Sequence, residues 1–353
     1  MTELKTFLKD MISTSGLSGF EAPIRSIITE EWKSLTDEQH VSALGSLHGL
    51  KRGEGEDPRP SILIATHMDA IGLMVTRLLP GGFLHITEIG GIDARVLPGM
   101  PVMVHGREDI PGIVVQPPAF LLPEDKASGP VGLGQLLIDT GLPENKVTEL
   151  VRVGDTISFN TPATELGDDG LSGHSLDNRA SVAALTHCLR LLQRRKHQWD
   201  VWAVATAQEE ETLGGAFTSA YELRPKLAIA VDVTFGTSPG SPGHKTFKMG
   251  SAPVLGWGPN IHPGLHRALK KTADKLELKT EFETHTRYSG TDAVALQIVN
   301  EGIPAMVISI PLRYMHTPVE MILMKDVERV GWLMAEFITN LDTDFMNTLT
   351  LDE

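Results

Sequence analysis

Four short apolar runs, each followed by a carboxylate or an imidazole, constrain the fold of this chain more than any other feature of its sequence. The runs cover residues 61–66, 201–205, 227–231 and 305–310. Compact apolar runs of this length are typical of strands that are buried on both faces of a parallel sheet. In open α/β sheets, ligands bind beyond the carboxyl ends of the strands, so we expect the polar side chains after the runs to meet at one edge. These side chains are His67 and Asp69, Glu209 and Glu210, Asp232, and His316.

Helical segments separate the apolar runs. Apolar side chains recur at helical spacing over about residues 179–193, 265–276, 292–299 and 326–341. The first fifty residues also have the pattern of helices. Strands that alternate with helices predict an α/β fold in which a mixed sheet is sandwiched by helices.

A segment with a different residue pattern interrupts this alternation of strands and helices. Between about residues 71 and 166, short β-branched runs such as 101–104 and 112–115 are punctuated by Gly and Pro. This pattern predicts a small β-rich domain. We therefore expect a discontinuous catalytic domain, residues 1–70 and 167–353, with residues 71–166 inserted into it.

Composition and charge exclude some classes of partner. The formal net charge of −14 argues against a nucleic-acid-binding surface, which needs clustered Lys and Arg. No apolar segment approaches the ~20 residues that a membrane span needs, so no membrane partner is expected. The N-terminus lacks a basic region followed by an apolar run, which predicts a cytoplasmic protein without a secretory signal.

The residue types at the predicted edge are those of a catalytic metal site. Carboxylates mixed with imidazoles are the ligands of zinc and its neighbours, and such a set leaves coordination positions for water. A structural zinc site would normally use cysteines, and Cys188 is the only one. Asp177, just before the helix expected at 179–193, is a further candidate ligand. Alone, this residue would be interpreted as a helix N-cap.

Two further roles follow from spacing. Asp69 lies two residues after His67 on an extended segment and is expected to accept the proton of the second imidazole nitrogen, which would orient the ring. Glu209 and Glu210 are neighbours in the chain, and we expect them to have different roles. One can bind metal while the other acts as general base, its pKa raised by burial.

Motifs spread over most of the chain resemble the co-catalytic metallopeptidases called TET or glutamyl (deblocking) aminopeptidases. The resemblance rests on segments 66–75, 176–179, 208–210, 258–263, 289–293 and 303–320. It implies a zinc-peptidase-like catalytic domain interrupted by a PDZ-like dimerisation domain. It also implies two divalent ions per chain, expected to be Zn²⁺, with Co²⁺ and Mn²⁺ as alternatives.

Residue by residue, the resemblance implies roles for the candidate side chains. Glu209 would be the general base when a metal-bridging hydroxide attacks the first peptide bond of a short peptide. One ion would be held by His67 and Asp232, the other by Glu210 and His316, and both by Asp177. In the family, the inserted domain forms dimers, and six dimers close into a dodecamer. We therefore expect a homo-oligomer through the insertion, with a simple dimer as the alternative.

Other functions stay open at this point. A carboxypeptidase, deacylase or dipeptidase would use the same metal ligands and differ in the group that it recognises. A glycosidase also uses paired carboxylates, but it acts without metal and seldom needs two histidines. A binding protein on a peptidase scaffold would lack the base, whereas Glu209 is present.

Overall fold

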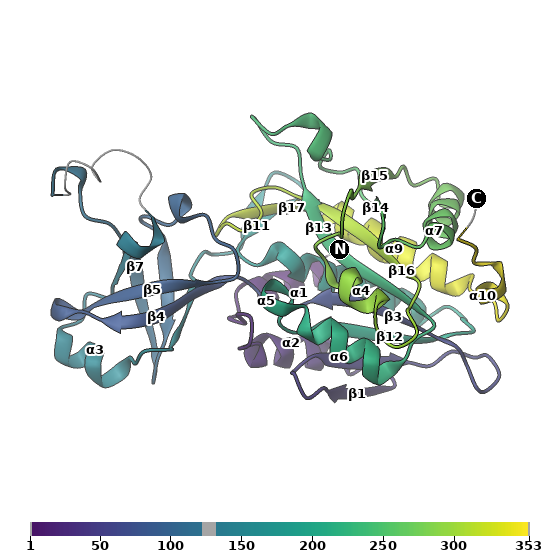
Figure 1. The fold of residues 1–353 in the computed structure, drawn as a ribbon, viewed down its shortest axis with the longest axis horizontal. Helices are drawn as coiled ribbons and strands as arrows, with labels where there is room; N and C mark the ends of the chain where they lie inside the picture. Colours follow the sequence, from purple (N-terminus) through teal and green to yellow (C-terminus); the bar gives the residue numbers. More distant parts are fainter. Residues whose placement is uncertain (1, 122–131, 352–353) are drawn as a thin grey trace.

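A computed structural model describes residues 2–121 and 132–351 of the 353-residue chain. Residues 122–131 of the predicted insertion lie outside the described part. The chain forms an eight-stranded sheet with helices, a three-stranded sheet and a closed six-stranded barrel. Figure 1 shows the barrel standing to one side of the larger helix-and-sheet body.

The eight-stranded sheet is mixed, as predicted. Its order is β1-β2-β12-β3-β13-β16-β14-β15, and the four neighbouring strands from β12 to β16 run parallel. These four central strands coincide with the four apolar runs, and nearly all their residues are buried. Their bounds are β12 (Asp200–Thr206), β3 (Ser61–His67), β13 (Leu227–Phe235) and β16 (Ala305–Leu312).

The outer strands of this sheet correct one expectation. The prediction of helices throughout the first fifty residues is wrong after α1 (Thr2–Ile12) and α2 (Ala22–Trp32), because an antiparallel hairpin follows them. The hairpin strands are polar or short, so they lack the apolar run that identifies a central strand. The outer strands are β1 (Glu38–Val41), β2 (Leu47–Lys51), β14 (Val254–Trp257) and β15 (Glu281–Thr284).

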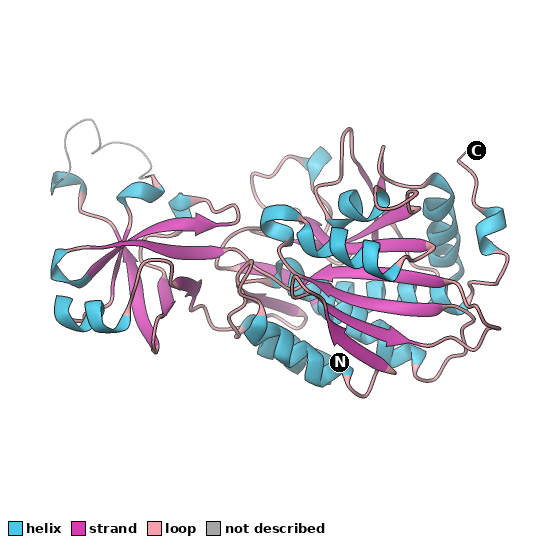
Figure 2. Ribbon diagram, turned by 60° about the horizontal axis from the view of Figure 1, so that its bottom comes forward, coloured by secondary structure: helices cyan, strands magenta, loops and turns pink. Residues whose placement is uncertain are grey.

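Helices cover both faces of the large sheet (Figure 2). On one face α4 (Leu176–Leu192) and α9 (Met324–Thr339) pack against each other, and α1 and α7 (Pro263–Lys275) contact them. On the other face α6 (Gly214–Leu223) packs against α8 (Asp292–Gln297). The short α5 (Glu209–Thr212) and α10 (Phe345–Thr348) complete this body, whose helices and strands share one hydrophobic core.

The barrel has a separate hydrophobic core and lies within the predicted insertion. Its strands are β4 (Gly72–Leu78), β5 (Phe83–Ile89), β8 (Leu137–Asp139), β7 (Asp109–Val115), β6 (Pro101–His105) and β9 (Thr156–Phe159). A short helix, α3 (Glu144–Leu150), packs against its edge. The β-rich character expected of this segment is thus confirmed, while its PDZ-like nature and the domain bounds stay predictions.

The three-stranded sheet lies where the chain returns from the barrel. It consists of β10 (Thr164–Leu166), β11 (Gly170–Gly173) and β17 (Glu320–Leu323). The pairing of β11 with β17 brings the segment before α4 beside the segment that follows β16. Two candidate residues from distant parts of the sequence, Asp177 and His316, are brought close by this pairing.

Candidate active site

The carboxyl ends of the parallel strands bring the predicted residues to one edge of the sheet. His67 is the last residue of β3 and pairs in register with Thr206, the last residue of β12. Glu209 and Glu210 follow directly in α5, and Asp232 lies in the second half of β13. The predicted residues thus meet beyond the carboxyl ends of the parallel strands, where open α/β sheets bind ligands.

Asp177 lies at the start of α4, where the backbone is not yet helical. Its φ of −78° and ψ of 103° are extended, and the peptide bond to Asn178 is cis. The side-chain amide of Asn178 donates a hydrogen bond to the Val231 carbonyl, 2.8 Å away, beside Asp232. This contact fixes the beginning of α4 against the central strand β13.

The two carboxylate oxygens of Asp177 face two different histidines. Asp177 Oδ1 lies 3.1 Å from His67 Nε2, and Asp177 Oδ2 lies 3.4 Å from His316 Nε2. Asp232 lies on the His67 side, with its Oδ1 3.8 Å from His67 Nε2. Glu210 lies on the other side, with its Oε2 3.5 Å from His316 Nε2. Asp177 is therefore central, with one imidazole and one further carboxylate on each side.

The neighbouring Glu209 and Glu210 face different histidines. Glu209 Oε2 is 3.7 Å from His67 Nε2, whereas Glu210 approaches His316. Asp69 holds both of them through the backbone: its Oδ1 accepts the N–H of Glu209 at 3.1 Å and its Oδ2 accepts the N–H of Glu210 at 3.2 Å. The carboxylate of Asp69 thus orients the acidic turn as a whole.

The contact of Asp69 with His67 differs in detail from the expectation. His67 Nδ1 lies 3.2 Å from the backbone oxygen of Asp69, while the nearest carboxylate oxygen is 3.5 Å away. Both groups face Nδ1 and leave Nε2 directed at Asp177. The role of Asp69 as the group that orients His67 stays a prediction.

Burial perturbs the acids of this site strongly. Loss of hydration raises the pKa of Glu209 and of Asp232 well above the usual range, and each is raised further by neighbouring carboxylates. The same two causes raise the pKa of Glu210 to about 8. Within the described residues, Glu210 Oε1 is also buried without a hydrogen-bond partner. A group of buried acids with such values favours a bound positive charge.

The pKa values of the two histidines also rise, which favours their charged forms. Burial alone would lower the pKa of His67, but Glu209, Asp177 and the other acids outweigh burial and raise it. The hydrogen bond to Asp177 raises the pKa of His316 to about 9. Burial would raise the pKa of Asp177, yet the two histidines lower it below its usual range. Asp177 is thus the carboxylate that stays charged.

Two sets of three side chains here have the geometry to hold a cation. His67, Asp177 and Glu210 form one set, and His67, Glu209 and Asp232 form the other, with ligand atoms in each set within 4.8 Å of one another. His316 is in neither set, although its Nε2 faces Asp177 and Glu210. The mixture of imidazole nitrogen and carboxylate oxygen fits zinc and similar divalent ions.

One buried carboxylate with a positioning role was not singled out from the sequence. Glu320, on β17, accepts the backbone N–H of Asp177 and the backbone N–H of His316, each at 2.9 Å. It therefore links the two residues that face each other across the site. The only available signal was its place in the segment 303–320 that carries the resemblance.

A cavity of about 770 Å³ opens beside these residues. Its wall includes Glu283, whose Oε1 accepts the hydroxyl proton of Thr234 at 2.8 Å, together with Tyr288 and Phe235. Sequence reasoning gave no reason to select Glu283, because it lies in the polar edge strand β15. The cavity supplies space for a small substrate directly against the acidic turn.

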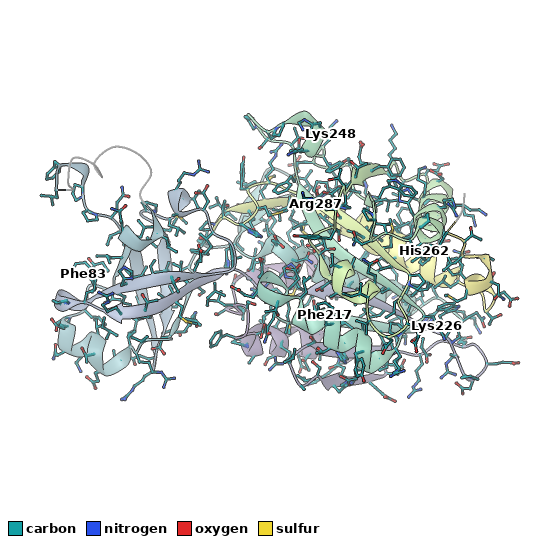
Figure 3. The ribbon with its side chains drawn as sticks, in the orientation of Figure 1. Phe83, Phe217, Lys226, Lys248, His262 and Arg287 are labelled. Atoms are coloured by element: carbon teal, nitrogen blue, oxygen red, sulfur yellow. The ribbon has the colours of Figure 1, made fainter. Side chains whose placement is uncertain are left out.

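Two other histidines, His262 and His174, do not line this cavity. His262, labelled in Figure 3, precedes α7, and its Nδ1 accepts the N–H of Gly264 at 3.1 Å. It therefore caps a helix. His174 is buried, and burial lowers its pKa to about 3.

Comparison with known proteins identifies the family. Residues 45–333, which contain all the candidate site residues, match the family described as M42 glutamyl aminopeptidase. The chain belongs to this family. It is 32% identical to the lysyl aminopeptidase of Pyrococcus furiosus over 95% of this chain and 96% of that protein.

Solved structures agree with this assignment. The TET aminopeptidase of the marine sediment archaeon Thaumarchaeota archaeon SCGC AB-539-E09 superimposes with a TM-score of 0.93 at 29% identity, covering 99% of each chain. The TET1 peptidase of Pyrococcus horikoshii, described as assembling into a tetrahedron or a large octahedral shell, matches with a TM-score of 0.83 at 29% identity, over 96% of this chain and all of that one. The fold and the assignment as an aminopeptidase of the M42 family follow from these matches.

The helices of residues 2–121 and 132–351 include none with the length and hydropathy needed to span a lipid bilayer.

Proposed function

We propose that this M42 family member is a two-metal aminopeptidase that removes N-terminal residues from short peptides. The observation that carries the proposal is the position of Asp177, whose two oxygens face His67 and His316 from the centre of a buried acidic site. A carboxylate in this position suits a bridge between two cations. In the proposed arrangement His67 and Asp232 hold one ion, and Glu210 and His316 hold the other.

When bound, two such ions would polarise the scissile carbonyl and make a water molecule acidic enough to react near neutral pH. Zn²⁺ is the ion we propose, with Co²⁺ or Mn²⁺ as substitutes, since sites of nitrogen and oxygen ligands accept several metals. The buried oxygen of Glu210 that has no hydrogen-bond partner in the described part of the chain supports this occupancy.

Glu209 is proposed as the general base. Burial raises its pKa above the usual range of a glutamate, which makes its carboxylate a stronger base. It would take a proton from the attacking water and return it to the amine that leaves. The hydrogen bond from its backbone to Asp69 keeps the carboxylate on the His67 side of the site.

The same ligands would serve a carboxypeptidase, a deacylase or a dipeptidase, so the decisive test concerns the substrate. One tetrapeptide is compared with its N-acetylated form and its C-terminal amide, each incubated with the zinc-loaded protein. We expect release of the first residue from the free peptide and the amide, and none from the acetylated form. Cleavage that needs the free carboxyl terminus would indicate a carboxypeptidase, and removal of the acetyl group would indicate a deacylase. A glycosidase would instead cleave carboxymethylcellulose and leave all three peptides intact.

We further propose that the chain forms dimers through the barrel and a dodecamer from six dimers, acting in the cytoplasm. Large apolar side chains of this region are exposed: Ile113 by 50%, Phe120 by 85% and Leu121 by 68%. Exposed apolar groups that lie close together favour an interface. The shells described for the Pyrococcus horikoshii peptidase support the larger assembly. Active sites that face an enclosed space would admit short peptides only.

A further inference from the structure

Two histidines and a glutamate form a compact cluster at the outer hairpin of the large sheet. His40 on β1 and His48 on β2 are directly opposite each other in the hairpin, and Glu222 is in the last turn of α6. His48 Nδ1 lies 2.8 Å from His40 Nε2, which lies 2.9 Å from Glu222 Oε1. Figure 1 shows β1 and α6 side by side at the lower edge of the body. The cluster shares no residue with the two sets at the active site.

The ring of His48 is held in one orientation. Its Nε2 lies 2.8 Å from the hydroxyl of Ser219, one helical turn before Glu222 on α6. When the Nε2 proton is donated to this hydroxyl, the lone pair of Nδ1 faces His40. A hydrogen bond at the second ring nitrogen is the usual way in which proteins orient a histidine that binds metal.

The two histidines of the cluster differ in exposure. The side chain of His48 is fully buried, with none of its surface accessible to solvent. His40 and Glu222 are exposed, so an ion can reach the cluster from solvent.

The three ligand atoms need only small movements to surround an ion. Zn–N distances of about 2.0–2.1 Å in a tetrahedral site place neighbouring ligand atoms roughly 3.3 Å apart. The present separations of 2.8 and 2.9 Å are those of a hydrogen-bonded network in which a proton on His40 Nε2 occupies the centre. Since His40 and Glu222 are surface side chains, both can turn outward by this amount.

We propose that His40, His48 and Glu222 bind a third divalent transition-metal ion, of which zinc is the best match. Two imidazoles and one carboxylate are a familiar ligand set for zinc, and the fourth position would be left to water. The ion would take the place of the proton on His40 Nε2, and that proton would move to Nδ1 of the same ring, so that His40 binds as a neutral imidazole.

An ion in this position would connect the outer hairpin to the helix that follows the acidic turn. Glu222 belongs to α6, which begins two residues after α5, the turn that carries Glu209 and Glu210. The hairpin already contacts the other end of the turn, because Ser46 Oγ accepts the N–H of Ala207 at 3.2 Å. The proposed site would therefore stabilise the packing of β1, β2 and α6 around the catalytic segment without taking part in the reaction.

The test counts ions. The full chain is stripped with a chelator, dialysed to equilibrium against buffered micromolar Zn²⁺, and analysed for zinc per chain. We compare the wild type with His40→Gln and Glu222→Gln, whose altered side chains are exposed. His244→Gln, which removes an exposed histidine elsewhere, is the matched control.

We expect wild type and His244→Gln to bind one zinc more per chain than His40→Gln, and to bind it more tightly than Glu222→Gln. Zinc should also raise the melting temperature of wild type more than that of either cluster variant. Equal zinc content in wild type and both cluster variants would overturn the proposal. A protein that binds two ions and no third would refute this site alone, whereas a protein that binds none would refute the proposed two-metal function.

Discussion

His174 is expected to make the protein sensitive to acid, and its surroundings give the magnitude. The side chain is 3% exposed, its Nδ1 has no hydrogen-bond partner within the described residues, and the ring packs edge-on against Phe159, with centroids 5.8 Å apart. Burial first, and then the positive charge of Arg179, lower its pKa from 6.5 to about 3. A proton therefore binds this histidine far more easily in the unfolded chain than in the folded one.

The direction of the effect follows from this difference. A histidine whose folded pKa is lowered contributes its full stability above pH 6.5 and loses it as the pH falls towards 3. Each pKa unit corresponds to about 1.4 kcal/mol, so the contribution of His174 to the free energy of unfolding falls by about 2 kcal/mol between pH 7 and pH 5. The complete loss, approached near pH 3, is about 5 kcal/mol.

The assay compares wild type with His174→Leu, a variant that fills the same space with a side chain that cannot titrate. Both are stripped of metal and unfolded with urea at pH 7 and at pH 5, at one protein concentration. Tryptophan fluorescence is the probe, because all five tryptophans lie outside residues 71–166 and report on the body that carries His174. His244→Leu controls for the loss of an exposed histidine.

From pH 7 to pH 5, the free energy of unfolding of wild type and of the control should fall by about 2 kcal/mol relative to that of His174→Leu. This difference does not depend on how much the leucine itself changes the stability at pH 7. Groups shared by all three proteins cancel in this comparison. Equal losses in wild type and His174→Leu would refute the reasoning. They would mean that water reaches the ring in the folded state, or that the histidine finds a hydrogen-bond partner there.

Four further outcomes are expected. Glu209→Gln should lower kcat by ~10²–10⁴-fold with both ions retained, whereas Glu210→Gln should lose one of the two ions by elemental analysis; unchanged turnover in Glu209→Gln would exclude it as the base. Asp69→Asn should also lower kcat, since an amide offers one acceptor where the carboxylate now accepts two backbone N–H groups, and the pH profile should shift with it. Light scattering should give a mass that is a multiple of 38.4 kDa, and a mass near one chain would refute assembly. Finally, metal-free His174→Leu, which lacks the opposing contribution of His174, should become less stable from pH 5 to pH 8, because a raised carboxyl pKa such as that of Glu210, about 8, contributes stability only while the group is protonated; urea unfolding of this variant with and without zinc should show the trend in the metal-free form alone.

The central sheet could be predicted because strands buried on both faces are recognisable from their apolar residues. A strand covered on both faces is apolar at most positions, and β3, β12, β13 and β16 are such strands. The edge strands lack such apolar runs. β1 has the sequence EQHV and is largely exposed, so its pairing with β2 rests on tertiary contacts that no short pattern records.

The gathering of the site residues was predictable for a similar reason, and their individual contacts were not. Parallel strands end at one edge, so the residues that follow them must lie near one another. Which glutamate faces which histidine depends on the backbone of the turn, where Gln208 has a left-handed φ of 59° just before Glu209. Glu320 was missed because its two hydrogen bonds join segments that only the β11–β17 pairing brings together.

The residue types indicate a metal site, but the reason for one lies in the folded structure. The carboxylates of Asp177, Glu209, Glu210 and Asp232 are almost fully withdrawn from water and lie around the same two histidines, so their negative charges repel one another. Without cations, the loss of hydration and, after it, this repulsion raise the pKa values of three of the four. Asp177 is the exception because it faces both histidines. Its position between them keeps it charged, which agrees with the bridging role proposed for it, and the other three carboxylates become available as ligands when their protons leave.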